Sequence, residues 1–459
     1  MNVRRARIRP LPLAAVLLLG LLAALGTLDL RARRPAAPPR LLSASLERGA
    51  LRAGAGRAGI DLPPDVVLGG YEAFGRRPEG GAADLSARAL VLEAGGLRTA
   101  LVLVELMTLP PSLVAAIRGR AAAAGIGCAL VAATHTHAGP GGYDRALLPQ
   151  LVLGAFDPAV EAAVLDAVSA AIAAAGADLG PARLAAGEIE ARWLVSNRDH
   201  RGAPVDRRMT RVELARPDGG RIATVLRLAA HPTLLPRRQG PAGDWPGLLM
   251  DRLDREGGVS FVVQGAVGDA RATRRASPGR RSERASTFAA TVAEVAAGIE
   301  LERAPGVVAL GCAEAEVDLP PADLAGMMPP GLGTLVSNLA DAFAPRTARV
   351  AALRLGDRAW VGTPGEPLAI DAPAIERPAA EAGVEARVVG IAQGYVSYLV
   401  GAREMEARTP SARNAWFGAA LAPRLIAGAQ VVARAVASAE GRAPPPGTGD
   451  DARREAALQ

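Results

Sequence analysis

Hydrophobic residues in this chain form short runs whose spacing alternates between that of strands and that of helices. Three pairs of strand-like runs are each joined at a two-residue turn, which predicts β-hairpins. The paired runs cover residues 89–106, 209–230 and 350–362, with turns at Gly95-Gly96, Asp218-Gly219 and Gly356-Asp357. Hairpins make antiparallel strand pairs, so a purely parallel sheet is excluded.

Helical segments separate these hairpins. Residues 111–125 have helical spacing, and residues 128–134 form a short apolar run typical of a buried strand. Asp157 and Pro158 are suited to the N-cap and first turn of a second helix, which Gly176 closes. The pattern therefore predicts an α/β fold in which mixed sheets are covered by helices.

The two ends of the chain differ from its middle. Residues 1–10 are basic, and residues 11–28 are uncharged and apolar, with a length between that of a signal-peptide core and a membrane span. We expect residues 1–30 to be a signal peptide or membrane anchor that places the protein in the cell envelope. Residues 31–58 predict a flexible tether and 441–459 a disordered tail, leaving 59–440 as the folded domain.

The charge distribution excludes one class of partner. The formal net charge is +7, but the 53 basic residues are scattered among 46 acidic ones. No basic stripe is interleaved with aromatic residues, which make up only 3% of the chain. We therefore expect no nucleic-acid binding.

The two cysteines, Cys128 and Cys312, lie far apart and have no spacing typical of a metal site. A disulfide between them would fit an exported protein. Cys128 lies inside an apolar run, however, where cysteine commonly behaves as a small hydrophobic residue. The local pattern therefore favours two buried free thiols.

Two of the four histidines stand two positions apart at the end of a predicted strand. His135 and His137 follow the apolar run at 128–134, and on a continuing strand both side chains would face one pocket. Gly139 and Gly141, in the Gly-Pro-Gly-Gly segment that follows, would let a substrate approach the backbone closely. The simpler interpretation is two polar residues at a strand end.

Further polar residues follow other predicted strands. His231 comes directly after the strand that ends at 230, and Glu366 follows the one that ends at 362. Tyr395 and Tyr398 follow the apolar run at 386–394. Sheet proteins commonly place their sites at such strand ends, and histidine, carboxylate and tyrosine side chains form an acceptable zinc-binding set. Taken singly, each is more often a hydrogen-bonded loop residue.

Seven segments of this chain resemble a known family. In order, they are "GGYEAF", "THTHAGPGGY", "SNRD", "HPTLL…AGDWPG", "VVQGAVGD", "TPGE" and "YVSYLVGAREMEARTPSARNAWFG". Their order and spacing, from about residue 60 to 430, are similar to those of the N-terminal domain of neutral/alkaline non-lysosomal ceramidases. In that family a zinc ion bound to an α/β domain hydrolyses the amide bond of ceramide, an N-acylsphingosine.

The resemblance implies a role for each matching residue. The implied zinc ligands, for one Zn²⁺ per chain, are His135, His231, Glu366 and Tyr398. The gap-free match after the tyrosine selects Tyr398 over Tyr395. His137 would line the reaction centre as an acid/base group, and Arg198 would orient the substrate or stabilise charge. Asp244 is either a partner that orients a ligand imidazole or a solvated turn residue.

The chain departs from the family pattern at two positions and at its end. Arg271 stands where the family has a serine, and Pro410 stands where it has a second active-site tyrosine. Arg271 would present a positive charge to an anionic or more polar substrate. The immunoglobulin-like domain of longer members has no counterpart in this sequence, so we expect a divergent member of the family.

These inferences predict a zinc-dependent amidohydrolase of sphingolipid metabolism, or of another N-acyl substrate, that uses a zinc-activated water. Its partners would be a lipid-like or N-acyl substrate and, through residues 11–28, a membrane. Two alternatives remain open: an envelope-tethered homologue that binds zinc or lipid without turnover, and a zinc esterase on another substrate. Neither the acyl group nor the oligomeric state follows from the sequence.

Overall fold

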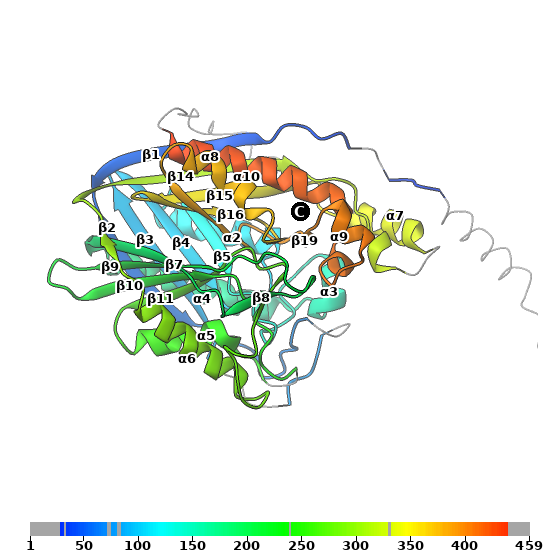
Figure 1. The fold of residues 1–459 in the computed structure, drawn as a ribbon, viewed down its shortest axis with the longest axis horizontal. Helices are drawn as coiled ribbons and strands as arrows, with labels where there is room; N and C mark the ends of the chain where they lie inside the picture. The colour runs from blue at the N-terminus through cyan, green and yellow to red at the C-terminus, as the bar shows by residue number, and fades with distance from the viewer. Residues whose placement is uncertain are drawn as a thin grey trace, which may run out of the picture.

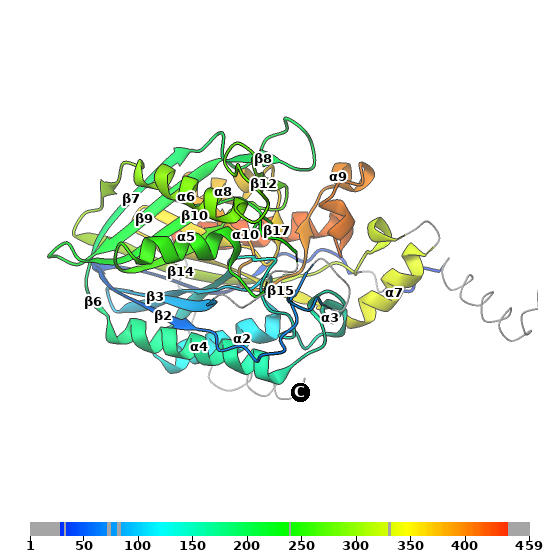
Figure 2. The ribbon, with the colours of Figure 1, turned by 90° about the horizontal axis from the view of Figure 1, so that it is seen from below.

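Three five-stranded sheets surround a shared hydrophobic core, and helices cover their outer faces (Figures 1 and 2). The computed structural model describes residues 28–31, 34–70, 75–79, 84–237, 240–328 and 332–438. The core contains inward-facing residues of all three sheets, among them Leu92, Phe261 and Leu353. The predicted α/β class with mixed sheets and covering helices is confirmed.

The first sheet carries the two predicted site histidines at the end of its edge strand. Its strands, in spatial order, are β5 (Cys128–Ala133), β4 (Leu97–Val104), β3 (Ser86–Ala94), β2 (Arg52–Gly59) and β6 (Gly180–Pro181). β5 runs parallel to β4, whereas the other pairs are antiparallel. Helices α2 (Pro111–Ala123) and α4 (Pro158–Ala177) cover its outer face.

The second sheet leads to His231. Its strands are β11 (Val259–Gln264), β10 (Arg221–Leu228), β9 (Arg208–Ala215), β7 (Arg183–Glu190) and β13 (Glu302–Arg303). β10 and β11 are parallel, so both carboxyl ends reach the same edge. Helix α5 (Asp244–Asp254) packs on β11, and α6 (Arg284–Ala297) packs on α5.

The third sheet leads to Glu366 and Tyr398. Its strands are β1 (Arg40–Ala50), β14 (Val307–Asp318), β15 (Thr347–Leu355), β16 (Arg358–Gly362) and β18 (Glu385–Val389). β16 and β18 are parallel. Helices α8 (Ala372–Ala380) and α10 (Leu421–Ala437) cover this sheet.

Short elements complete the fold around the carboxyl ends of these strands. Two small sheets pair β8 (Val195–Asn197) with β12 (Ala270–Ala272), and β17 (Glu366–Pro367) with β19 (Tyr398–Leu399). The remaining helices are α3 (Leu147–Leu153), α7 (Gly333–Phe343), α9 (Ala402–Glu406) and the 3₁₀ turns η1 (Ala325–Met327), η2 (Ala412–Asn414) and η3 (Gly418–Ala420).

The local predictions made from periodicity are confirmed where the structure describes them. All three hairpins form, β3–β4, β9–β10 and β15–β16, with turns at the predicted positions. The side chain of Asp157 accepts a hydrogen bond from the backbone N–H of Ala159 at 2.9 Å, so it caps α4 as expected. Helix α4 ends at Ala177, one residue beyond the predicted glycine.

The prediction of a flexible tether over 31–58 is wrong. Residues 40–50 and 52–59 are β1 and β2, and β1 pairs with β14 along most of its length. Two glycines of β2 are required by packing: a Cβ at Gly54 would lie 2.2 Å from the carbonyl oxygen of Ala175, and one at Gly56 would lie 2.2 Å from that of Ala171. Helix α4 therefore packs closely on β2 because that strand lacks side chains there.

The prediction of free thiols is also wrong, because Cys128 and Cys312 form a disulfide. It joins β5 of the first sheet to β14 of the third, with Cα atoms 6.4 Å apart. The apolar sequence around Cys128 predicts the strand β5. It does not indicate that β14, which carries Cys312, packs beside that strand.

The predicted leader or anchor and the predicted tail fall mostly outside the described residues, since the description begins at Leu28 and ends at Ser438. Among the described helices, two segments are long and apolar enough to span a membrane, Pro158–Ala177 and Gly418–Ala437. Both pack against sheets of the core, so their composition is explained by burial.

Candidate metal and active site

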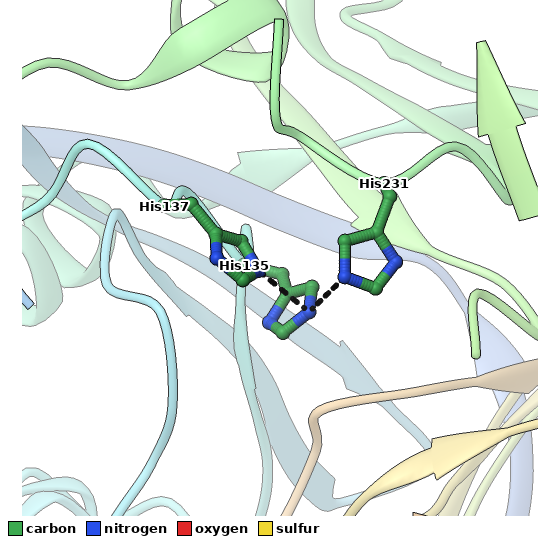
Figure 3. Close-up of side chains that lie close together, drawn as sticks. All are labelled: His135, His137 and His231. Carbon is green, nitrogen blue, oxygen red and sulfur yellow. Dashed lines mark hydrogen bonds between the residues drawn. The ribbon is translucent and has the colours of Figure 1, made fainter. Parts of the chain in front are cut away.

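Polar residues from all three sheets meet at the carboxyl ends of their strands. His135 and His137 follow β5, His231 follows β10, and Glu366 follows β16. The parallel pairing of β17 with β19 places Glu366 opposite Tyr398. Figure 3 shows the three imidazoles pointing toward one another, two from the segment after β5 and one from the segment after β10. The structure thus brings together every residue that the resemblance marks as a zinc ligand.

A turn, not a continuing strand, aims the first two histidines. β5 ends at Ala133, and His135 has a φ of 68°, in the left-handed region that only a few non-glycine residues adopt. The prediction that both side chains share one face of a strand is therefore wrong. The turn nevertheless brings the Nε2 atom of His137 to 3.4 Å from that of His135. Such strain, on the order of 1–3 kcal/mol, is characteristic of functional sites.

The spacing of the donor atoms suits a metal ion. The Nε2 atom of His135 lies 3.2 Å from that of His231 and 3.4 Å from Oε1 of Glu366. The Nε2 atom of His231 lies 3.7 Å from Oε2 of Glu366 and 3.5 Å from the phenol oxygen of Tyr398. Donors bound tetrahedrally at zinc distances of roughly 2.0–2.1 Å are separated by about 3.3 Å. The ligand atoms of the three histidines all lie within 4.8 Å of one another, so this cluster can hold a metal.

Backbone carbonyls orient two of the imidazoles. The Nδ1 atom of His135 lies 2.7 Å from the carbonyl oxygen of Met107, and that of His231 lies 3.2 Å from the carbonyl oxygen of Val267. A carbonyl oxygen only accepts, so the proton is assigned to Nδ1 in both rings. The lone pair of each Nε2 is then directed at the centre of the cluster, as in ligand histidines.

Glu366 is buried with one oxygen atom unpaired. Its Oε1 accepts a hydrogen bond from the phenol of Tyr395 at 2.8 Å, whereas its Oε2 has no hydrogen-bond partner. The residue is only 1% exposed. A carboxylate oxygen buried without a partner is costly, and a bound cation would satisfy it.

Burial and neighbouring charges hold the site in the protonation state that binds metal. Burial, with the charges of neighbouring groups, keeps the pKa values of His137 and His231 well below the usual value, so both imidazoles are neutral at pH 7. Burial by itself would raise the pKa of Glu366, but His135 and Arg198 outweigh it and lower this pKa. Neutral imidazoles and an ionised carboxylate are the forms that coordinate metals.

Arg198 supplies a fixed positive charge beside the cluster. Its NH2 group donates to the phenol oxygen of Tyr398 at 2.8 Å, and its Nε donates to the carbonyl of Gly268 at 3.0 Å. Burial opposes the charged guanidinium, but Tyr398 and Glu366 outweigh burial and raise its pKa. Burial and Glu366 raise the pKa of Tyr398 well above the usual value, while Arg198 acts in the opposite direction.

A pocket of about 380 Å³ contains the cluster and adjoins a larger apolar cavity. The three histidines, Arg198 and Glu366 all line the pocket. The neighbouring cavity has a volume of about 700 Å³, and mostly aliphatic and aromatic side chains line it. The two share the lining residues Asp144, Pro149, Val152, Met327, Tyr395 and Trp416. The site can therefore accommodate a polar group beside the cluster and a long apolar group next to it.

Asp244 supports the loop after His231 and accepts no hydrogen bond from an imidazole of the described residues. Its Oδ2 accepts from the backbone N–H groups of Leu234 and Leu235, at 2.9 and 3.0 Å. It is 1% exposed, so the alternative of a solvated turn residue is wrong. Burial raises its pKa to about 6, although the three backbone amides it accepts from oppose the shift.

Gly139 and Gly141 lie near the site without lining its pocket. A Cβ at Gly141 would lie 1.9 Å from the carbonyl oxygen of Leu153, and one at Gly139 would lie 3.0 Å from the side chain of Thr136. Leu153 and Thr136 of the protein itself therefore occupy the space beside these two glycines. In the described structure, the prediction that they admit a substrate has no support.

The two departures from the family pattern lie away from the pocket. Arg271 is exposed on β12, opposite Ser196 of β8, and Pro410 is exposed before η2. Neither lines the pocket or the apolar cavity. The expectation that Arg271 presents its charge to a substrate is therefore wrong, because alternation along β12 directs its side chain outward.

Two aromatic residues at the site were not predicted to act there. Tyr395 was set aside in favour of Tyr398, yet its phenol donates to Glu366 and its ring contacts that of Trp416 edge-on. Trp416 lies in the segment "NAWFG", where nothing local distinguishes it from a core aromatic. The position of Tyr395 after a predicted strand is visible in the sequence, but the contact of either residue with the site requires the tertiary structure.

Comparisons with known proteins agree with this geometry. Residues 52–233 match the family model described as "Neutral/alkaline non-lysosomal ceramidase, N-terminal". A stretch of 55 residues is 47% identical to the neutral ceramidase of Mycobacterium tuberculosis, and it covers 12% of this chain and 9% of that protein. The sequence match thus spans only a small part of that relative's length.

Solved structures match over most of the chain. The crystal structure of neutral ceramidase from Pseudomonas aeruginosa superposes with a TM-score of 0.73 at 22% identity, covering 87% of this chain and 77% of that one. A second structure, described as a ceramidase complexed with C2, gives a TM-score of 0.71 at 19% identity, with the same coverage. At these identities the likeness establishes the fold.

Proposed function

Because this chain belongs to the neutral/alkaline non-lysosomal ceramidase family, we propose that it is a zinc-dependent hydrolase of an N-acyl lipid such as ceramide. One observation carries the proposal: three imidazoles and an unpaired buried carboxylate oxygen converge in a pocket that adjoins an apolar cavity.

The residues that would hold the zinc ion are His135, His231, Glu366 and Tyr398. Their donor atoms have the separations that a tetrahedral ion requires, and the unpaired Oε2 of Glu366 supplies the negative charge. When bound, zinc polarises a carbonyl oxygen and lowers the pKa of a coordinated water toward about 7.

His137 and Arg198 would act on the substrate. His137 is neutral at pH 7, so its unprotonated ring nitrogen can take up the proton of the attacking water and deliver it to the leaving amine nitrogen. Arg198 stays charged and lines the same pocket, where it can stabilise negative charge on the carbonyl oxygen as the C–N bond breaks. The products are a carboxylic acid and an amine.

The apolar cavity favours a long acyl chain or a sphingoid chain over a short polar substituent. Its walls are mostly apolar and its volume is about 700 Å³. Burying a hydrocarbon chain contributes about 0.8 kcal/mol per methylene group. The main support for a protein that binds zinc or lipid without turnover was the replacement of two family residues by Arg271 and Pro410. Neither position lines the pocket, so this support is lost.

We also propose that the protein acts in the cell envelope. Residues 11–28 are apolar and uncharged, and the disulfide between Cys128 and Cys312 fits an oxidising compartment.

The decisive experiment is hydrolysis of a substrate panel by zinc-loaded protein. The panel contains ceramide, N-acyl amino acids and simple esters, and free amine or acid is measured. We expect turnover of a long-chain amide, and a fall on the order of a hundredfold or more for His137→Ala, as for the loss of an acid/base group. Arg271→Ser is the matched control and should retain the preference of the wild type. No turnover of any substrate would favour a binding protein, and turnover of esters alone would favour an esterase.

A further inference from the structure

Helix α7 is oriented with its polar residues inward and its apolar residues outward. Ser337 and Asp341 are 1% and 4% exposed, whereas Leu339 and Phe343 are each 60% exposed. An amphipathic helix on a water-facing surface has the opposite arrangement. Leu339 and Phe343 therefore form an outward apolar face of α7.

Specific polar contacts fix this orientation. Asp341 accepts two hydrogen bonds from the guanidinium of Arg34, at 2.7 and 2.8 Å, and a third from the backbone N–H of Ala322. The hydroxyl of Ser337 accepts from the backbone N–H of Leu324 at 2.9 Å. Rotating the helix to hide its leucines would break these buried bonds, so the outward apolar face is built into the fold.

Other exposed apolar side chains lie at the same end of the molecule. Helices α3 and α7 lie side by side there in both views (Figures 1 and 2). Seven of the eleven large hydrophobic side chains that are exposed among the described residues belong to α3, to α7 with the residue before it, and to the segment 28–30, which is hydrogen-bonded to α7. We call these seven the apolar rim: Leu28, Leu30, Leu147, Leu151, Leu332, Leu339 and Phe343. Such a concentration of exposed apolar side chains marks an interaction surface.

The apolar rim borders the opening of the apolar cavity. Leu151, Leu339 and Phe343 line that cavity while remaining 47–60% exposed. The cavity leads to the histidine cluster through the lining residues that it shares with the site pocket. A molecule that enters the apolar cavity across the rim thus lies next to the pocket that contains the histidine cluster.

The chain that precedes the described residues starts from this rim. The amide group of Asn338 on α7 binds the backbone on both sides of Asp29, accepting from the N–H of Leu30 at 3.0 Å and donating to the carbonyl of Leu28 at 2.8 Å. Residues 11–28, which lead directly into this contact, are apolar and uncharged over a length close to that of a membrane span.

We propose that the apolar rim docks on a lipid bilayer, so that the apolar cavity opens toward the membrane. The rim and residues 11–28 would then meet the same bilayer, and Leu339 and Phe343 of α7 would lie at the level of the acyl chains. Docking on the bilayer does not require hydrolysis. It rests on the proposed function only for the identity of the molecule that enters the cavity.

The test uses the full chain, reconstituted with vesicles of phosphatidylcholine and phosphatidylglycerol. Single cysteines are introduced as Leu339→Cys or Phe343→Cys and labelled with the fluorophore NBD; Cys128 and Cys312 are already paired. Val307→Cys is the matched control, because Val307 is 57% exposed but lines a different cavity. We expect lipids brominated on their acyl chains to quench the labels at 339 and 343 at least twofold more than the label at 307.

A second comparison tests whether the whole rim takes part. Leu147→Asp together with Leu332→Asp, in the protein labelled at 343, should reduce the quenching at least twofold. Leu248→Asp, at an exposed leucine of α5, should leave it unchanged. Equal quenching at 307, no quenching at 339 and 343, or no binding to vesicles would overturn the proposal.

Other occupants of the rim would give different results. Labels at 339 and 343 that are shielded from water even without lipid would point to residues 1–27 folding over the rim. If this shielding depends on protein concentration, it would point instead to a second copy of the chain. Either result overturns membrane docking. The fluorescence does not depend on turnover, so quenching of an inactive protein would contradict the proposed function alone.

Discussion

The phenol of Tyr395 donates to Oε1 of Glu366 at 2.8 Å and leaves the other oxygen of that carboxylate without a partner. Tyr395 thereby fixes the carboxylate while Oε2 faces the Nε2 atom of His231 at 3.7 Å. We expect Tyr395→Phe to lower zinc affinity about tenfold, as for other residues that orient a metal ligand. Competition against a chromophoric chelator measures the affinity. Tyr398→Phe, which removes a proposed ligand, should weaken binding further; the opposite ranking would assign the ligand role to Tyr395.

Removal of a histidine ligand should separate metal binding from catalysis. Purified protein should contain about one zinc per chain, and His135→Ala or His231→Ala should lose most of it, because fewer protein ligands remain. His137→Ala should keep the zinc and lose activity. Elemental analysis after dialysis gives the content. Loss of zinc from His137→Ala would show that the three histidines form the metal site, whereas full zinc content in all three variants would contradict the site.

Zinc should also stabilise the folded protein. A ligand that binds only the native state at a hundred times its Kd contributes about 2.7 kcal/mol. We therefore expect chelation to lower the Tm of the wild type, and to leave the Tm of Glu366→Gln almost unchanged because its site no longer holds the ion. Differential scanning calorimetry with and without added zinc makes the comparison. Equal shifts in both proteins would place the stabilising zinc elsewhere.

The partly buried carboxyl of Asp371 makes stability depend on pH. Burial raises the pKa of Asp371 to about 7, and the nearby Asp269 and Glu404 add to this shift. The folded state binds this proton more tightly than the unfolded state, whose pKa is about 3.9, so its contribution to stability falls as pH rises from about 4 to 7. Relative to wild type, Asp371→Asn should be more stable at pH 8 than at pH 5, by roughly 2–4 kcal/mol. Denaturant titrations at both pH values measure the difference, with Asp218→Asn as a control for the loss of an exposed charge. An equal effect of Asp371→Asn at both pH values would contradict the raised pKa.

The close contact between β2 and α4 predicts a position-specific effect of adding one methyl group. Gly54→Ala would place a Cβ 2.2 Å from the carbonyl oxygen of Ala175, and overpacking of this kind costs about 1–3 kcal/mol or more. Gly59→Ala, at the end of the same strand, meets no atom within 4 Å and should be close to neutral. Chemical denaturation of both variants tests the difference. Equal stability would show that α4 can move away from β2.

Local sequence determined several elements of this protein but only part of their assembly. The three hairpins and the cap of α4 follow from turn residues and periodicity, because backbone preferences act over a few residues. The positions of His135, His231, Glu366 and Tyr398 after strands could be predicted for the same reason. Which strand ends meet could not, because β5, β10 and β16 belong to three different sheets.

Only the tertiary structure determined the features that local composition predicted wrongly or did not predict. Residues 40–58 have a linker-like composition, yet they form β1 and β2 because β14 and α4 supply the partners. Cys128 found its disulfide partner 184 residues away, on a strand of another sheet. Arg271 points outward, and Leu339 and Phe343 of α7 face outward, because long-range contacts set the orientation of β12 and α7. Pairing across the chain depends on the packing of whole sheets, which no short window of sequence contains.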